Sequence, residues 1–143
     1  MSFDLKIVDG DLAIGADGDL AKVENTEKLI QDVLKLALTP AGANPFFPWY
    51  GSHISKSLIG SSFDLTFLGP MASQQLRNAL EIIQTLQKIQ SNSGQFVSAS
   101  ELLAAIQEVY VEQNQTDPRY FKVSIKILTK EMTSFTTSFD VTL

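Results

Sequence analysis

The segment that most restricts how this chain folds is residues 38–54, LTPAGANPFFPWYGSHI, which follows directly after a helical pattern. Pro40, Pro45 and Pro48 each fix the backbone angle φ, remove a backbone donor and restrict the residue before them. A regular helix or strand is therefore not expected to run through this segment. We predict a stiff loop whose shape is set before it meets any partner.

The same loop holds four aromatic residues, and each ring can bury on the order of 150–250 Å². Because the prolines restrict the free chain, the loop loses little entropy on binding. We expect at least two rings to cover the hydrophobic core and the others to anchor a partner, with about 2 kcal/mol or more for each anchor. Gly51 allows a backbone turn that a side chain would block. The four aromatic residues are Phe46, Phe47, Trp49 and Tyr50.

Short alternating segments precede this loop, and they contain the near-repeat DGDLAIG at 9–15 and DGDLAKV at 17–23. Each Asp-Gly pair supplies the positive φ of a tight hairpin turn. A calcium loop fits less well, because an EF-type loop needs a different spacing of its acidic ligands. We predict a small N-terminal β-hairpin or meander with apolar side chains on one face, namely Phe3, Leu5, Ile7, Leu12 and Ile14.

Two helices are predicted, one on each side of the loop. The first begins near Glu27, is capped by Asn25 or Thr26, and ends before Pro40. The second covers about 71–91 and ends at SNSG. Both carry apolar sectors wider than one core contact needs, so we expect the first to be buried on more than one side. Such sectors fit a compact core and a face that awaits a partner equally well.

The final third changes from a helical to an alternating period. Ser98 or Ser100 is predicted to cap a short helix through ELLAAIQ, after which EVYVEQ is extended and NQTDP turns. Apolar and polar residues alternate along two further segments, YFKVSIKIL and SFTTSFDVTL. Together with EVYVEQ they are predicted to form three antiparallel strands. Strands, then helices, then strands predict an α+β fold with helices packed on one face of an antiparallel sheet.

Composition narrows the possible functions. The 143 residues fit a single domain, 1–143, and the net charge of −5 comes without any Lys/Arg run, which argues against direct nucleic-acid binding. There is no cysteine and one histidine, so neither a cofactor nor a metal site is expected. No apolar stretch is long enough for membrane insertion, and we expect the protein to be made in the cytoplasm.

Two motifs resemble one known family. The first motif consists of Leu38, Thr39, Gly42, Pro48 and the aromatic-Gly-Ser run at 50–52. It resembles the signature of the small baseplate wedge proteins of contractile-tailed phages and related injection systems. Those proteins often carry the name tail lysozyme. The family also has Glu-Pro-Arg before a strand, where this chain has Asp117, Pro118 and Arg119. Two departures are Ala43, where a Glu commonly follows the motif glycine, and the extended EVYVEQNQ, where a helix is expected.

This resemblance implies a virion structural protein in a heteromeric complex. Its expected partners are the larger baseplate wedge subunits and the tail sheath protein, with the first sheath ring seeded by strand exchange at the C-terminal strand that ends at Leu143. Asp117, Pro118 and Arg119 are then partner-binding residues. From the residues alone, an internal ion pair closing a surface turn is an equal alternative for Asp117 and Arg119.

The lysozyme name implies an alternative, a peptidoglycan hydrolase. Glycoside hydrolysis needs two carboxylates facing each other across a cleft, one of them with a raised pKa. No pair is marked for that role, and Gly-Ser-His-Ile around His53 matches no nucleophile elbow. We therefore expect no catalytic residues and a structural role. The available carboxylates are Asp64, Glu101, Glu108, Glu112 and Asp117.

Overall fold

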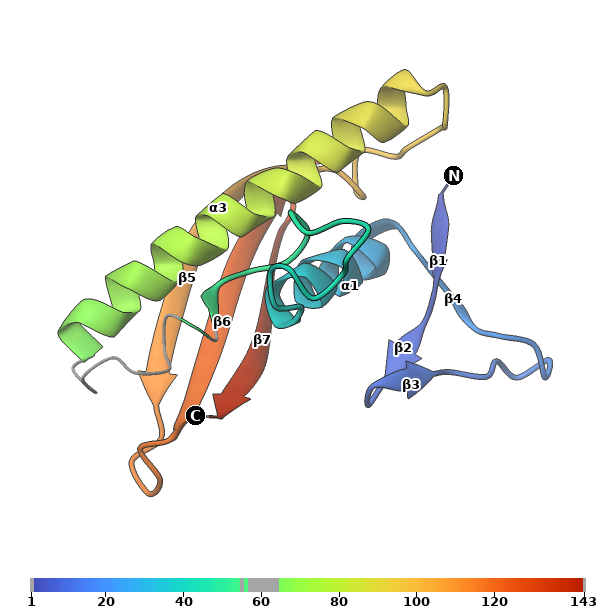
Figure 1. Ribbon diagram of the computed structural model, residues 1–143. Coiled ribbons are helices and arrows are strands. Elements are labelled where there is room, and N and C mark those ends of the chain that lie inside the picture. Colours follow the sequence, from blue (N-terminus) through green and yellow to red (C-terminus); the bar gives the residue numbers. More distant parts are fainter. Residues whose placement is uncertain (1, 55, 57–64, 143) are drawn as a thin grey trace.

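A computed structural model describes residues 2–54, 56 and 65–142. Within these residues, four short strands come first, two helices follow, and three long strands come last, which confirms the α+β class (Figure 1). In chain order the elements are β1 (Phe3–Leu5), β2 (Ile7–Val8), β3 (Asp11–Leu12), β4 (Lys22–Glu24), α1 (Asn25–Leu38), α3 (Leu65–Asn92), β5 (Leu103–Gln113), β6 (Tyr120–Thr129) and β7 (Ser134–Thr142).

The three long strands form an antiparallel sheet in the order β5-β6-β7, as predicted. Burial alternates along β6, because one face of the sheet packs under α1 and α3 and the other faces solvent (Figure 1). The core between helices and sheet includes the fully buried Phe121, Leu36, Leu76 and Leu80. Leu143, where the predicted last strand ends, lies outside the described residues.

The helix predicted through ELLAAIQ is wrong, because Glu101 and Leu102 lie in a turn and strand β5 begins at Leu103. Ser98 and Glu101 do form one half of a capping box, in which the Ser98 amide donates to Glu101 Oε2 at 2.7 Å. The Ser98 hydroxyl also donates to this carboxylate, at 2.8 Å, and the Glu101 amide donates to Ser98 O. They close a single turn only. Beyond it, the Gln87 side chain donates to Glu101 O and accepts from the Leu103 amide, so α3 holds the backbone extended for pairing with β6.

Helix α1 begins at Asn25, slightly earlier than predicted, and ends at Leu38, before Pro40. The predicted cap at Asn25 or Thr26 is wrong, because both residues lie inside the helix. Glu24 is the N-cap residue and makes no capping side-chain bond, while Asn25 Oδ1 accepts from the Ser100 hydroxyl and shares the proton of the Ser98 hydroxyl with Glu101. Within the helix only Glu27 and Leu38 are exposed, so its burial on more than one side is confirmed.

Helix α3 begins at Leu65 rather than near residue 71, and it contains Pro70. Proline there removes one backbone hydrogen bond, but the turns beside it bury Leu68 and Ala72 completely against the core. The helix ends at Asn92, and Gly94 follows with a φ of 82°, as the SNSG stop predicted. Among the described helices, none is both long and apolar enough to cross a membrane.

The N-terminal strands form the predicted meander. β2 and β3 pair through a turn at Asp9 and Gly10, whose φ angles are 52° and 82°. β1 pairs with β4, and an isolated bridge joins Ile14 to Leu20. The two ladders meet at Lys6. The Ala13 amide donates to Lys6 O, and the Lys6 amide donates to Ala21 O.

A buried carboxylate joins the N-terminus to the start of β5. Glu101 is only 1% exposed, and it accepts hydrogen bonds from the Ser2 hydroxyl and from the amide and hydroxyl of Ser98. Burial raises the pKa of Glu101, but these hydrogen bonds and the charge of Lys28 outweigh it, so the pKa lies below the ordinary value. The ionised form is therefore the one that the fold holds.

Replacing Glu101 with glutamine is expected to lower the free energy of unfolding by about 1–3 kcal/mol at pH 7, because the amide nitrogen cannot accept from Ser98 or Ser2. The contribution of the carboxylate is present above pH 4.5, the ordinary pKa of the group, and it is lost as the pH falls through the lowered folded-state pKa. Urea unfolding between pH 7 and pH 3 measures this. A stability gap that stays constant down to pH 3 contradicts the assignment.

Candidate partner-binding surface

The proline and aromatic loop is closed at its two ends by backbone and side-chain hydrogen bonds. The Ser52 amide donates to Thr39 O at 2.8 Å, and the Ala41 amide donates to Ser52 O at 3.0 Å. The Ser52 hydroxyl, which is buried, donates to Ala37 O at 2.6 Å, and the Thr39 hydroxyl donates to Lys35 O at 2.6 Å. Residues 39–52 therefore form a compact loop with adjacent ends, fixed to the last turn of α1.

Gly51 permits this closure. Its φ is 122°, and a Cβ placed on it would lie 2.6 Å from Thr39 O and 2.9 Å from Ala41 N. Gly42 also has a positive φ, 85°, but has open space around it. It lies in the turn in which the Ala43 amide donates to Pro40 O. The motif residues Thr39, Gly51 and Ser52 thus hold the loop together.

The rings are more exposed than predicted. Phe46 is 85% exposed, Phe47 53% and Trp49 51%, and only Tyr50 packs against the core. The expectation that at least two rings cover the core is wrong, because the Thr39–Ser52 closure directs the middle of the loop outward. Neighbouring rings contact edge to face, with centroids 5.8 Å apart for Phe47 and Trp49 and 6.3 Å apart for Trp49 and Tyr50.

Charged groups surround the base of the loop near Tyr50. Lys35 Nζ pairs with Asp4 and, at 3.2 Å, with Asp32. Burial raises the pKa of the Tyr50 phenol, and Lys35 opposes this. Burial also works against the charge of Lys35, but its bonds to Asp4 and Asp32 outweigh that effect and raise its pKa. The Lys35–Asp4 ion pair thus ties α1, which carries the loop, to the meander.

An apolar stripe on α3 continues the loop surface. Trp49 lines a hollow of about 350 Å³ between the loop and α3, together with Pro48, His53 and Ala79. It also lines a second hollow, of about 390 Å³, along Ile82, Leu86 and Ile89, of which Ile89 is 60% exposed. These three residues belong to the wide apolar sector that the sequence predicts. We call the exposed rings together with this stripe the loop–helix surface.

The Asp117-Pro118-Arg119 turn joins β5 to β6, distant from the loop–helix surface in the sequence. Arg119 donates to Asp117 through Nε at 3.1 Å and through a terminal nitrogen at 2.9 Å. These bonds lower the pKa of Asp117, and the same pair raises the pKa of Arg119. Arg119 is 66% exposed in its side chain, so the internal ion pair leaves part of the guanidinium accessible.

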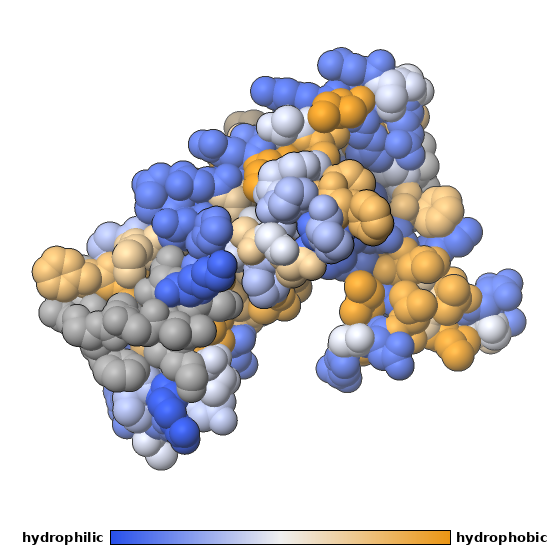
Figure 2. Space-filling model, viewed as in Figure 1, coloured by the Kyte–Doolittle hydropathy of each residue, from blue (hydrophilic) through white to orange (hydrophobic). Residues whose placement is uncertain are grey.

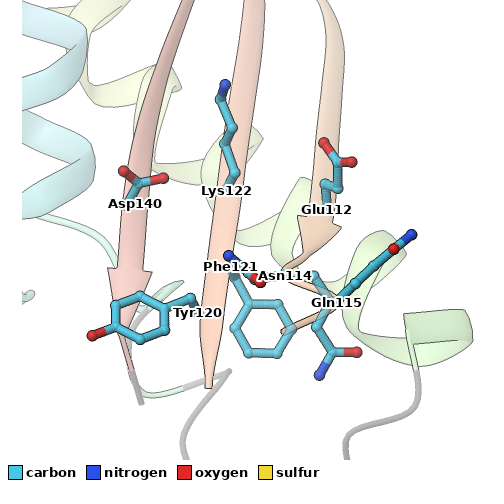
Figure 3. A pocket seen from close by; sticks show the side chains of 8 residues that line it. Glu112, Asn114, Gln115, Tyr120, Phe121, Lys122 and Asp140 are labelled. Carbon is cyan, nitrogen blue, oxygen red and sulfur yellow. The ribbon is translucent and has the colours of Figure 1, made fainter. Parts of the chain in front are cut away.

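The solvent face of the sheet carries a charged row that sequence reasoning did not single out. Register places Lys122 of β6 between Glu112 of β5 and Asp140 of β7. The three side chains lie beside a hollow of about 340 Å³ at the end of the sheet (Figure 3). The alternation of YFKVSIKIL predicts that Lys122 faces outward, but only strand pairing shows which carboxylates flank it.

β7 is an outer strand of the three-stranded sheet. Its exposed and covered residues alternate, with Phe139 and Val141 buried against the core. An outer strand has one side of its backbone outside the sheet, and another chain can pair there.

Taken together, the sheet, the two helices on one of its faces and the N-terminal meander define a small α+β protein. No protein-family model and no curated protein matches the chain. Among solved structures, the fold is similar to the crystal structure of a candidate tail lysozyme from Geobacter sulfurreducens. The TM-score is 0.60, the sequence identity is 14%, and the match covers 82% of this chain and 89% of the other. At this identity the likeness concerns the fold.

Proposed function

We propose that this protein is a structural subunit of a contractile phage tail, located in the baseplate wedge and assembled in the host cytoplasm. It binds larger wedge subunits through the loop–helix surface. The observation that carries this proposal is a closed loop presenting Phe46, Phe47 and Trp49 to solvent beside an apolar helix stripe. Such a surface is unusual on a monomer and typical of a binding site.

The similarity to a candidate tail lysozyme supports a role in a phage tail. The baseplate wedge position rests on the resemblance of the loop and the Asp117-Pro118-Arg119 turn to the wedge-family motifs. In the structure those motif residues have definite physical roles: Gly51 and Ser52 close the loop, and Arg119 stands accessible at the end of the sheet. The loop motif therefore supports the proposal by holding the exposed rings in place, and the Asp117-Pro118-Arg119 motif supports it by presenting Arg119.

Seeding of the first sheath ring is the second part of the proposal. A strand from the sheath protein would pair along the outer side of β7 and extend the β5-β6-β7 sheet. Each shared backbone hydrogen bond contributes about 1 kcal/mol net, so about five of them make a substantial anchor.

A structural role also fits the placement of the carboxylates better than hydrolysis does. Glu101 is buried and fully engaged by Ser2 and Ser98, and Asp117 is held by Arg119. Asp64 lies outside the described residues. Glu108 and Glu112 are exposed on the open face of the sheet, where Lys122 separates Glu112 from Asp140 (Figure 3). A sugar-cleaving pair needs a clear path between its carboxylates.

The test is co-expression of the chain with the larger wedge subunits encoded with it, followed by purification and measurement of the stoichiometry. A stable heteromeric complex is expected. In parallel, the purified chain is incubated with peptidoglycan at mildly acidic and neutral pH. Turnover that a single change such as Glu112→Gln abolishes would replace the structural role with a hydrolase.

Replacing Arg119 with alanine is expected to weaken assembly with the wedge subunits by about tenfold, because one accessible charged anchor is lost. The melting temperature is expected to stay unchanged, since the Asp117–Arg119 pair is exposed. Lys130→Ala, which removes another exposed cation near the sheet, is the matched control. Normal co-purification of the Arg119 variant would leave Arg119 with only its internal ion pair.

A further inference from the structure

The N-terminal meander presents its apolar face to solvent instead of to the core. In a paired ribbon, residues opposite each other share a face, and so do residues two apart. Ile7 pairs with Leu12, and Ile14 pairs with Leu20. Leu5 and Phe3 stand two and four positions before Ile7 along the ribbon. Six apolar residues therefore share one face. We call this set the meander face: Phe3, Leu5, Ile7, Leu12, Ile14 and Leu20.

Exposure agrees with this assignment. Five of the six residues are exposed: Ile14 by 73%, Phe3 by 53%, and Ile7, Leu12 and Leu20 by 42–47%. In Figure 2 apolar side chains gather over the region that Figure 1 assigns to β2 and β3. A contiguous cluster of this kind is uncommon on a protein that acts alone.

The opposite face of the meander is the one attached to the body. Val23 is buried there, and Asp4 bonds to Lys35 and, at 3.0 Å, to the Gln31 amide of α1. Gln31 also donates to Leu5 O at 2.8 Å and accepts from the Ile7 amide at 2.9 Å. Because these bonds fix the polar face to α1, the apolar face cannot turn inward without breaking them.

The charge around the meander face indicates what covers it. Residues 3–24 contain two lysines, five aspartates and one glutamate, a net charge of −4, and four of the aspartates flank the two turn glycines Gly10 and Gly18. Lys22 lies on the meander face itself, opposite Leu5 and over the Phe3 ring, so the acidic excess is at the turns. Two copies meeting through this face would bring the acidic turns together, and anionic lipid would be repelled. A protein surface bordered by lysine or arginine is complementary to it.

We propose that the meander face binds a second protein through an apolar patch bordered by basic residues. This site is separate from the loop–helix surface, since the β2–β3 hairpin lies on the far side of α1 from α3 (Figure 1). It is also independent of any role in a phage tail, because it follows from the polarity of the meander alone. The meander thus gives the chain a second binding surface.

The probe is a fluorescent 12-residue peptide of alternating leucine and lysine, with a leucine–glutamate peptide as its counterpart, titrated against the full chain. The lysine peptide is expected to bind, with weaker binding at high salt, and to shift the amide NMR signals of residues 3–22. Ile14→Ser is expected to weaken binding about tenfold. Met132→Ser, at a comparably exposed residue in the β6–β7 turn, is the control and should bind as the natural chain does.

Asp9→Asn combined with Asp11→Asn tests the charge separately, and asparagine accepts the positive φ of residue 9. This variant is expected to bind the lysine peptide less well at low salt. Equal binding of the glutamate peptide, no binding of the lysine peptide, or unchanged binding by Ile14→Ser would overturn the proposal. So would a dimer in sedimentation, or binding to phosphatidylglycerol vesicles, that Ile14→Ser abolishes.

Discussion

Replacing Gly51 with alanine is expected to lower the free energy of unfolding by about 2–4 kcal/mol, because the new Cβ would lie 2.6 Å from Thr39 O. That atom is backbone and accepts from the Ser52 amide, so it cannot move aside without opening the loop closure. Urea unfolding measures the loss. We also expect weaker binding of wedge subunits, since the rings would no longer be held in place.

Gly42→Ala is the matched control for this prediction. Gly42 has a positive φ of 85°, but a Cβ at this position would meet no other atom within 4 Å, so only the backbone conformation is penalised. Its expected cost is about 1–2 kcal/mol. Equal losses in the two variants would mean that the close approach at Thr39 does not fix the loop.

Much of the fold follows from local pattern. The alternation through Phe121, Val123, Ile125 and Ile127 predicts a half-buried strand, and those four residues are buried. The Asp-Gly pairs predict the first turn of the meander, and Pro40 predicts the end of α1. These features depend on residues near each other in the sequence, where backbone preference and period act directly.

The predictions fail where residues that are distant in the sequence determine the local structure. Ser98 and Glu101 form a cap-like turn, yet pairing with β6 and the side chain of Gln87 make the next residues a strand. Asn25 fits a helix cap locally, but the hydroxyls of Ser98 and Ser100, more than 70 residues later, take its side-chain oxygen. The hydrophobic periodicity of the sequence does not show with which distant residue an amide or carboxylate side chain forms a hydrogen bond.

The candidate site is predictable in its residues but not in its geometry. The prolines and rings indicate a binding loop, but the sequence does not show that the Thr39–Ser52 closure directs Phe46, Phe47 and Trp49 outward. The apolar alternation of the meander correctly predicts its shared face. Alternation alone does not show, however, to which side of the protein that face turns.

Replacing Trp49 with alanine is expected to weaken binding of the larger wedge subunits by about 2 kcal/mol or more, which is roughly 30-fold or more in the dissociation constant. Trp49 is half exposed, contacts the rings of Phe47 and Tyr50, and lines both hollows against α3. A partner side chain placed along Ile82 and Ile89 would therefore meet the indole directly. Titration of the purified chain with wedge subunits measures the change.

Phe96→Ala is the control. The Phe96 ring is 71% exposed, and the residue belongs to the segment that connects α3 to β5 in the chain, which is not part of the loop–helix surface as defined above. It is expected to bind as the natural chain does. The melting temperature of the Trp49 variant should fall only slightly, since half of the indole is already in water. If this variant instead melts several degrees lower and binds wedge subunits normally, Trp49 covers the core and the loop–helix surface loses its central anchor.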